Sequence, residues 1–189
     1  MQDKNPASLK GHFLTAMPGL ADPNFSYTVT CVCEHTPEGT LGIVINRPHP
    51  SLTAKLIFDE LKLPYVGASQ NAPIYVGGPV HMDQIFILHG PPFEWDGCLN
   101  VTTDLAMSNT LDILKAIALG NGPQLFMIAL GCAGWGAGQL ESEIKNNSWL
   151  TTPANHDIIF NIAVDQRWAA AVKQMGIDPA LLSIHAGHA

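Results

Sequence analysis

Short stretches of apolar residues, several alternating with polar ones, recur through the first half of the chain and again further on. A period of two, or a brief uninterrupted run rich in Val and Ile, is typical of a β-strand. The pattern predicts a hairpin from residues 27–34 and 41–46, because a Pro-Glu-Gly turn at residues 37–39 separates them. Further strands are predicted at residues 12–17, 74–76, 85–88, 99–102, 125–130 and 157–160.

Apolar residues spaced three and four apart predict helices elsewhere. The clearest is residues 109–119, where Asn109 and Asp112 form a cap pair and Gly120 ends the helix. Other helices are predicted at residues 53–63, with Thr53 as the cap, and at 139–146 and 164–175. Strands early and helices interspersed later favour a mixed α+β fold over a regular alternation of strands and helices, in a single domain over residues 1–189.

The charge balance argues against a protein that binds nucleic acid directly. The chain has sixteen acidic and nine basic residues, for a formal net charge of −7, and no two basic residues are adjacent. Nucleic-acid binding draws most of its affinity from lysines and arginines that neutralise phosphates. We therefore expect no meaningful direct affinity for DNA at physiological salt.

The longest uncharged stretch, residues 116–140, does not predict a membrane helix. Glycines and a proline interrupt it and leave residues 125–130 as its continuous apolar part, where a membrane helix needs about 20 residues. The first residues are polar and lack the apolar region of a secretory signal peptide. We expect a soluble, cytoplasmic protein with no membrane partner, and reduced thiols at its four cysteines.

Three potential metal ligands lie close together in the first predicted hairpin. Cys31, Cys33 and His35 occupy positions i, i+2 and i+4 of a strand, so their side chains would share one face and could begin a zinc site. No fourth ligand is obvious, and free cysteines are commonly small buried hydrophobes. We favour the buried interpretation and expect neither a stoichiometric metal nor another cofactor.

Residues 131–138 form a glycine-rich run between a predicted strand and a predicted helix. Backbone amides at the start of a helix can bind an anion, although this run is neither a P-loop nor a dinucleotide-binding fingerprint. The alternative is that the glycines permit tight turns and close packing around Trp135. The candidate ligand-binding residues of the run are Gly131, Cys132, Gly134, Trp135, Gly136 and Gly138. Cys132 also resembles a nucleophile at a sharp strand-to-helix turn, although the spacing is imperfect.

Three further side chains are candidates for a ligand site near this run: Arg47, His35 and His89. Arg47 follows a buried strand, where its guanidinium would bind a ligand's carboxylate or, as we favour, form an ion pair with Glu141 or Glu34. We interpret His89 as an interior histidine with satisfied hydrogen bonds, and we expect Glu143 to be solvated.

Several motifs together resemble one bacterial family. They are Gly11-His12-Phe13, Met17-Pro18, Cys33-Glu34-His35, the segment GIVINRP at residues 42–48, Gly77-Gly78-Pro79-Val80, Leu88-His89, GCAGWGAGQLESE at residues 131–143 and Asn147-Ser148-Trp149-Leu150. Spread nearly from end to end, they are similar to those of the YqgE/AlgH family. Cys132 is a departure, since the family usually has Tyr there.

The resemblance implies a largely antiparallel sheet with a small barrel-like core surrounded by helices. It also implies a role in regulation, because some members carry a transcriptional-regulator label linked to alginate biosynthesis. It carries over no catalytic residue.

Three classes of function remain open on these grounds. We favour a regulatory protein that binds a small molecule or a protein partner without turning it over. The first alternative is an enzyme, a hydrolase or transferase, that uses residues 131–138. The second is a transcription factor that contacts DNA directly.

Overall fold

The computed structural model describes residues 8–182. Ten strands form the sheet: β1 (His12–Ala16), β2 (Val29–Thr36), β3 (Gly39–Val44), β4 (Pro48–Thr53), β5 (Pro73–Val76), β6 (Val80–His89), β7 (Leu99–Asn100), β8 (Ala106–Ser108), β9 (Phe126–Gly136) and β10 (Trp149–Pro153). Within the same range five α-helices surround it: α1 (Ala54–Glu60), α2 (Leu111–Ala118), α3 (Gln139–Lys145), α4 (His156–Phe160) and α5 (Arg167–Gln174). Short 3-10 helices cover Gly67–Asn71, Val164–Gln166 and Pro179–Leu181.

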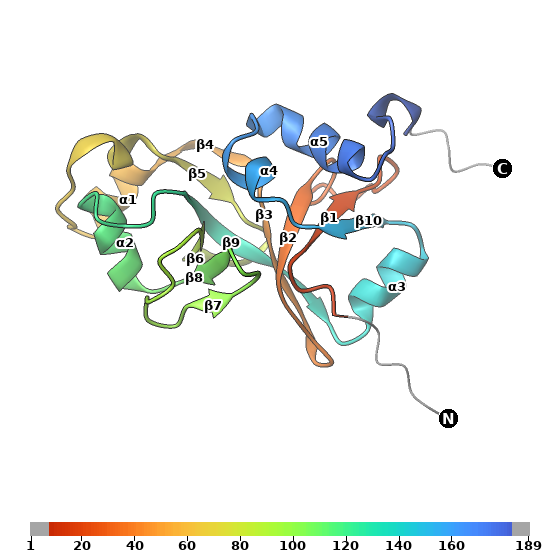
Figure 1. Ribbon diagram of the computed structural model, residues 1–189, viewed down its shortest axis with the longest axis horizontal. Coiled ribbons are helices and arrows are strands. Elements are labelled where there is room, and N and C mark those ends of the chain that lie inside the picture. Colours follow the sequence, from red (N-terminus) through yellow and green to blue (C-terminus); the bar gives the residue numbers. More distant parts are fainter. Residues whose placement is uncertain (1–7, 183–189) are drawn as a thin grey trace.

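The sheet is largely antiparallel and curls into a half-barrel. Its main path runs β10-β1-β2-β3-β9-β6-β8-β7. Off this path, β5 pairs with β9 in parallel and β4 pairs with β5. Figure 1 shows α1 and α2 at one end of the sheet, α3 at the other, and α4 and α5 along one side. The predicted α+β fold with a barrel-like, largely antiparallel sheet surrounded by helices is confirmed.

The long strand β9 holds the two parts of the sheet together. Its first half pairs with β5 on one side and β6 on the other, and its second half pairs with β3. The predicted hairpin is present as β2 and β3, and it reaches β9 through contacts such as Thr40 opposite Trp135.

Apolar side chains gather in three clusters on the two faces of the curled sheet. The inner cluster fills the curl and includes Phe13, Ile43 and Met127, with α4 and α5 packed against it. A second cluster lies between α1, α2 and the first half of β9, and a third between α3 and the strands β1 and β2. Leu140 of α3 is fully buried in the third.

The structure differs from the sequence prediction at a few elements. Residues 157–160 are not a strand but belong to α4, whose start is capped because the Asn155 side chain accepts a hydrogen bond from the amide of Asp157. Thr110, not Asn109, occupies the cap position of α2. The strands β4, β8 and β10 were not predicted, because they are short or lack a regular alternation. No helix within residues 8–182 is long and apolar enough to cross a membrane.

Candidate functional site

The glycine-rich run expected to form a loop is mostly a strand. Residues 131–136 continue β9, and Gly134 and Gly136 lie opposite Leu41 and Gly39 of β3. Only Ala137 and Gly138 connect the strand to α3, and Gly138 takes the left-handed conformation with φ 73°. The predicted loop is therefore wrong over residues 131–136, since this part of the backbone belongs to a ladder.

Gly131 is needed where two stretches of backbone touch. Its φ is 72°, and a Cβ there would lie 2.5 Å from the carbonyl oxygen of Gly78. A Cβ on Gly77 would in turn lie 2.2 Å from the carbonyl oxygen of Gly131. A left-handed glycine in a strand makes a bulge that shifts the alternation by one residue. Because of this shift, Ala129 and Cys132 both face the inner cluster.

Cys132 is a core residue rather than an exposed nucleophile. It is 1% exposed and packs in the inner cluster with Cys31 and Cys33. Burial raises the pKa of the Cys132 thiol, and a hydrogen bond involving Cys31 together with burial raises the pKa of Cys33 well above its ordinary value. Both effects keep these groups protonated and weakly nucleophilic.

Trp135 is the centre of an aromatic group that α3 holds in place. Its ring stacks on Phe25, with centroids 5.8 Å apart, and meets Trp149 edge-on at 5.9 Å. One carboxylate oxygen of Glu143 accepts hydrogen bonds from the indole nitrogens of both tryptophans, at 3.0 Å from Trp135 and 2.8 Å from Trp149. Gln139 donates to the other oxygen at 2.9 Å. The expectation that Glu143 is solvated was wrong, because this carboxylate is half-buried and accepts hydrogen bonds from both tryptophans.

His35 faces away from the two cysteines that were expected to share its side of the strand. A bulge between Val32 and Glu34 shifts the alternation of β2, so Cys31 and Cys33 stay in the inner cluster while His35 turns toward α3. This shift separates the three potential zinc ligands. Within residues 8–182, no group of three His, Cys, Asp or Glu side chains is placed to hold a metal ion.

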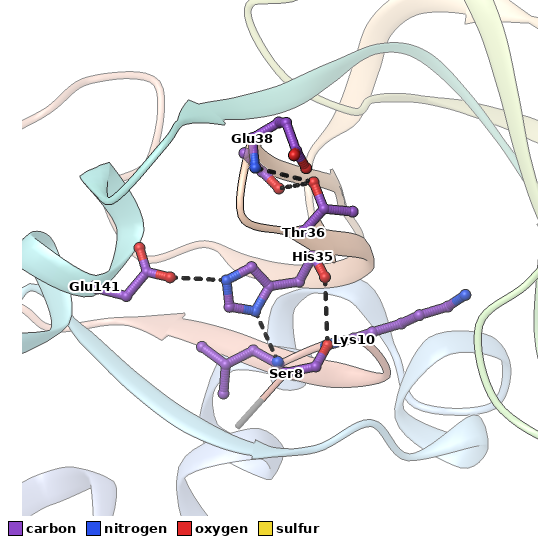
Figure 2. Close-up of polar contacts among 8 residues, drawn as sticks. Ser8, Lys10, His35, Thr36, Glu38 and Glu141 are labelled. Atoms are coloured by element: carbon purple, nitrogen blue, oxygen red, sulfur yellow. Dashed lines mark hydrogen bonds and ion pairs between the residues drawn. The ribbon is translucent and has the colours of Figure 1, made fainter. Parts of the chain in front are cut away.

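The hydrogen bonds of His35 define the roles of its two ring nitrogens. Figure 2 shows the imidazole between Glu141 and the start of the described chain. Nδ1 accepts a hydrogen bond from the amide of Leu9 at 2.8 Å, so it carries no proton, and Nε2 donates to Glu141 at 2.9 Å. Hydrogen bonds from its own backbone amide and from His35 lower the pKa of Glu141. The pair joins α3 to β2 and to residues before β1.

Arg47 and His89 lie in two other places. Arg47 donates to the backbone carbonyls of Asn24 at 2.7 Å and Ser26 at 3.1 Å, so the predicted ion pair with Glu141 or Glu34 was wrong. It does line a small cavity of about 60 Å³.

His89 is fully buried. Its Nδ1 is bonded to the carbonyl of Gly90 at 2.7 Å, and its Nε2 to the hydroxyl of Ser108 at 2.9 Å. Burial lowers the pKa of His89, which keeps the ring neutral, as an interior histidine with satisfied hydrogen bonds should be.

The candidate residues therefore do not converge on one cleft. Trp135 and His35 lie on the α3 side of the sheet, Cys132 faces the opposite side, and Arg47 and His89 lie apart from both. Ligand binding by any of the nine candidates stays a prediction.

A different residue, Arg167, has the features of a binding group. This first residue of α5 is only 5% exposed and lines a cavity of about 190 Å³. The cavity walls come from β5, the start of β9 and α4, and consist of Ala72, Pro73, Tyr75, Phe126, Met127, Ile128, Ile159 and Phe160. Arg167 is the only charged residue among them.

The hydrogen bonds of Arg167 are made with neutral groups. Its Nε donates to the carbonyl of Ile162 at 3.0 Å, and its Nη1 to the carbonyl of Ile45. The guanidinium carbon lies 5.4 Å from the centroid of the Tyr75 ring. No carboxylate among residues 8–182 forms an ion pair with it. Because buried charges are normally paired, this arrangement suits an anion supplied from outside the chain.

Comparison with known proteins places the chain in a family. Residues 13–180 match the family described as AlgH-like. The chain belongs to this family. It is 50% identical to a UPF0301 protein of Desulforapulum autotrophicum, with 94% of each chain covered, and 45% identical to one of Thioalkalivibrio sulfidiphilus, with 97% and 98% covered.

Two solved structures resemble the fold. The solution structure of the AlgH protein from Pseudomonas aeruginosa has a TM-score of 0.79 and 43% identity over the whole of both chains. A crystal structure from Corynebacterium diphtheriae has a TM-score of 0.69 at 21% identity, covering 92% of this chain and 90% of its own. The second likeness concerns the fold alone.

Sequence reasoning on this AlgH-like chain missed Arg167, although a signal was present. Arg167 and Ala171 lie four residues apart and are both buried on one face of α5. A charged residue on the apolar face of an amphipathic helix calls for a buried partner. The sequence shows that Arg167 lies on the apolar face of its helix. Only the fold shows that its side chain faces a cavity and not an acidic side chain.

Proposed function

We propose that this AlgH-like protein is a regulatory binding protein that recognises a small organic anion without turning it over. The observation that carries the proposal is the buried guanidinium of Arg167, which lines an aromatic cavity and pairs with no carboxylate among residues 8–182. A pocket that is mostly apolar and has one well-placed charged group is typical of small-molecule sites.

The chemistry of the site favours binding over turnover. Besides Arg167, the cavity is lined by apolar side chains and Tyr75, so it offers no evident general base or nucleophile. Of the features that supported the enzyme alternative, residues 131–136 of the glycine-rich run are a paired strand and Cys132 is a buried thiol. The net charge of −7 supports regulation through a ligand or protein partner rather than through direct DNA contact.

The proposal includes a cytoplasmic location. Cys31, Cys33, Cys98 and Cys132 are all free thiols, and free thiols fit a reducing compartment.

The test is thermal unfolding of the wild-type protein and of Arg167→Met with a panel of organic anions. An anion that binds only the folded state at one hundred times its Kd stabilises the wild type by about 2.7 kcal/mol. We expect this stabilisation to disappear in Arg167→Met and to remain in Arg47→Met, the control that removes the other arginine of the chain. Stabilisation that survives in Arg167→Met, or a panel with no effect on the wild type, would contradict the proposal.

A further inference from the structure

The N–H groups of Arg167 that are not already bonded to backbone carbonyls determine what kind of anion fits the site. Its Nε and Nη1 are bonded to the carbonyls of Ile162 and Ile45, while Nη2 makes no hydrogen bond to any residue in 8–182. Tyr75 lines the same cavity, and its hydroxyl likewise makes no hydrogen bond to a residue in that range. Two donors satisfy a carboxylate. A phosphate, with three terminal oxygens and more charge, calls for more donors than these.

The space next to the guanidinium accepts an apolar group. Apart from Arg167, all the wall residues are uncharged, and Phe126, Phe160 and Ile159 contribute large apolar surfaces. The volume of about 190 Å³ is somewhat more than the ~150 Å³ of an engineered apolar cavity that holds benzene. The ligand therefore combines one carboxylate with an apolar body.

A second cavity borders the first, on the α2 side of β9. It has a volume of about 290 Å³ and shares two wall residues, Ala72 and Phe126, with the Arg167 cavity. Its other walls are Ala68, Ser69, Ile117, Gly120, Gly122, Pro123 and Gln124, none of which is charged. The hydroxyl of Ser69 is already bonded to the carbonyls of Val66 and Ala118. An apolar chain that reaches this second cavity meets uncharged walls.

We infer that the ligand is a linear monocarboxylate with an extended apolar chain. Its carboxylate accepts hydrogen bonds from Arg167 Nη2 and the Tyr75 hydroxyl, and its chain passes Ala72 and Phe126 into the second cavity. This inference rests on the proposed function, and it adds the length, shape and charge of the ligand. Charge complementarity fixes the head of the ligand, and the uncharged second cavity fixes its tail.

The test compares butanoate, hexanoate and octanoate by isothermal titration calorimetry, with benzoate and 1-octanol as further probes. Each added methylene that enters an apolar site strengthens binding by about fourfold. The four methylenes by which octanoate exceeds butanoate should therefore make it bind about 250-fold more tightly. We expect 1-octanol, which lacks the charge, to bind far more weakly than octanoate.

Two variants test where the apolar chain of the ligand lies. Ala68 is exposed and lines only the second cavity, so Ala68→Trp should bring octanoate close to the affinity of butanoate and leave butanoate unchanged. Ala137→Trp, at an exposed alanine beside α3, is the matched control and should keep the full dependence on chain length.

The outcomes separate this inference from the proposed function. Affinities that do not rise with chain length, benzoate binding more tightly than octanoate, or an Ala68→Trp variant with unchanged octanoate affinity would overturn the extended ligand. Each of these leaves the anion site in place if Arg167→Met still abolishes the binding. Binding that survives in Arg167→Met would overturn both.

Discussion

Replacing Glu143 with alanine should destabilise the protein more than any ordinary change of a half-exposed acid. One oxygen of this carboxylate accepts hydrogen bonds from both Trp135 and Trp149, whose side chains are almost completely buried. Glu143→Ala leaves both indole N–H groups without an acceptor. No other acceptor is bonded to either nitrogen among residues 8–182.

The magnitude follows from the two lost bonds. A hydrogen bond to a charged group contributes about 1.5–3 kcal/mol, and the lower end applies because Glu143 is partly accessible to water. Two bonds then give a loss of about 3 kcal/mol in the free energy of unfolding. Glu143→Gln keeps an acceptor oxygen without the charge, and we expect it to lose about half as much.

Urea unfolding followed by tryptophan fluorescence measures this loss, because the affected indoles report on their own surroundings. The urea concentration at the midpoint of unfolding should fall, while the dependence of the free energy of unfolding on urea concentration stays constant. The control is Glu60→Ala, at an exposed acid at the end of α1, which should change the free energy by less than about 0.5 kcal/mol. If Glu143→Ala is as stable as this control, the shared carboxylate does not stabilise the aromatic group and the reasoning is wrong.

Three further changes test other parts of the fold. Gly131→Ala should lower the free energy of unfolding, measured by thermal unfolding, by more than about 2 kcal/mol, because φ is 72° and the new Cβ would meet a carbonyl oxygen at 2.5 Å. Gly134→Ala, where the nearest atom would be 3.6 Å from the new Cβ, should lower it by less than about 0.5 kcal/mol. Equal losses in the two variants would refute this. Ser108→Ala removes the hydroxyl from His89 Nε2 and should cost about 1–2 kcal/mol in chemical unfolding, and no loss would contradict that bond. The folded pKa of Glu141 is lowered, so its contribution is present above the unfolded value of ~4.3 and is lost as the pH falls through the folded value. Glu141→Gln should therefore be less stable than the wild type at neutral pH and approach it as the pH falls below ~4.3, and a difference that does not shrink in acid would count against the pair.

The sequence predicts most strands and helices here because their periodicity is local. The hairpin of β2 and β3 and the helix α2 are each visible as a pattern within one short stretch of the chain. The faces of the strands were harder to predict, since a bulge changes the alternation without changing the composition. The bulges at Gly131 in β9 and between Val32 and Glu34 in β2 decide which way Cys132 and His35 point.

The candidate site could be predicted only in part for a related reason. The glycine-rich run looks like a loop because glycine is common in turns, yet Gly131 serves a contact with Gly77 and Gly78, which are more than fifty residues earlier in the chain. The cavity at Arg167 joins β5, β9 and α4, three elements far apart in sequence. Such a site has no local motif, because it exists only once the sheet has curled.

The position of β9 also has a consequence for how the molecule comes apart. This strand completes the hydrogen-bond ladders of β5 and β6 with its first half and of β3 with its second. Detaching it would leave unpaired edges in both parts of the sheet and expose Met127, Ile128 and Trp135, which belong to three different apolar clusters. Neither part can open by itself at low cost, so the sheet behaves as one cooperative unit. Local opening is therefore confined to the peripheral strands, and backbone amides in the middle of β9 exchange with solvent only when the whole sheet unfolds.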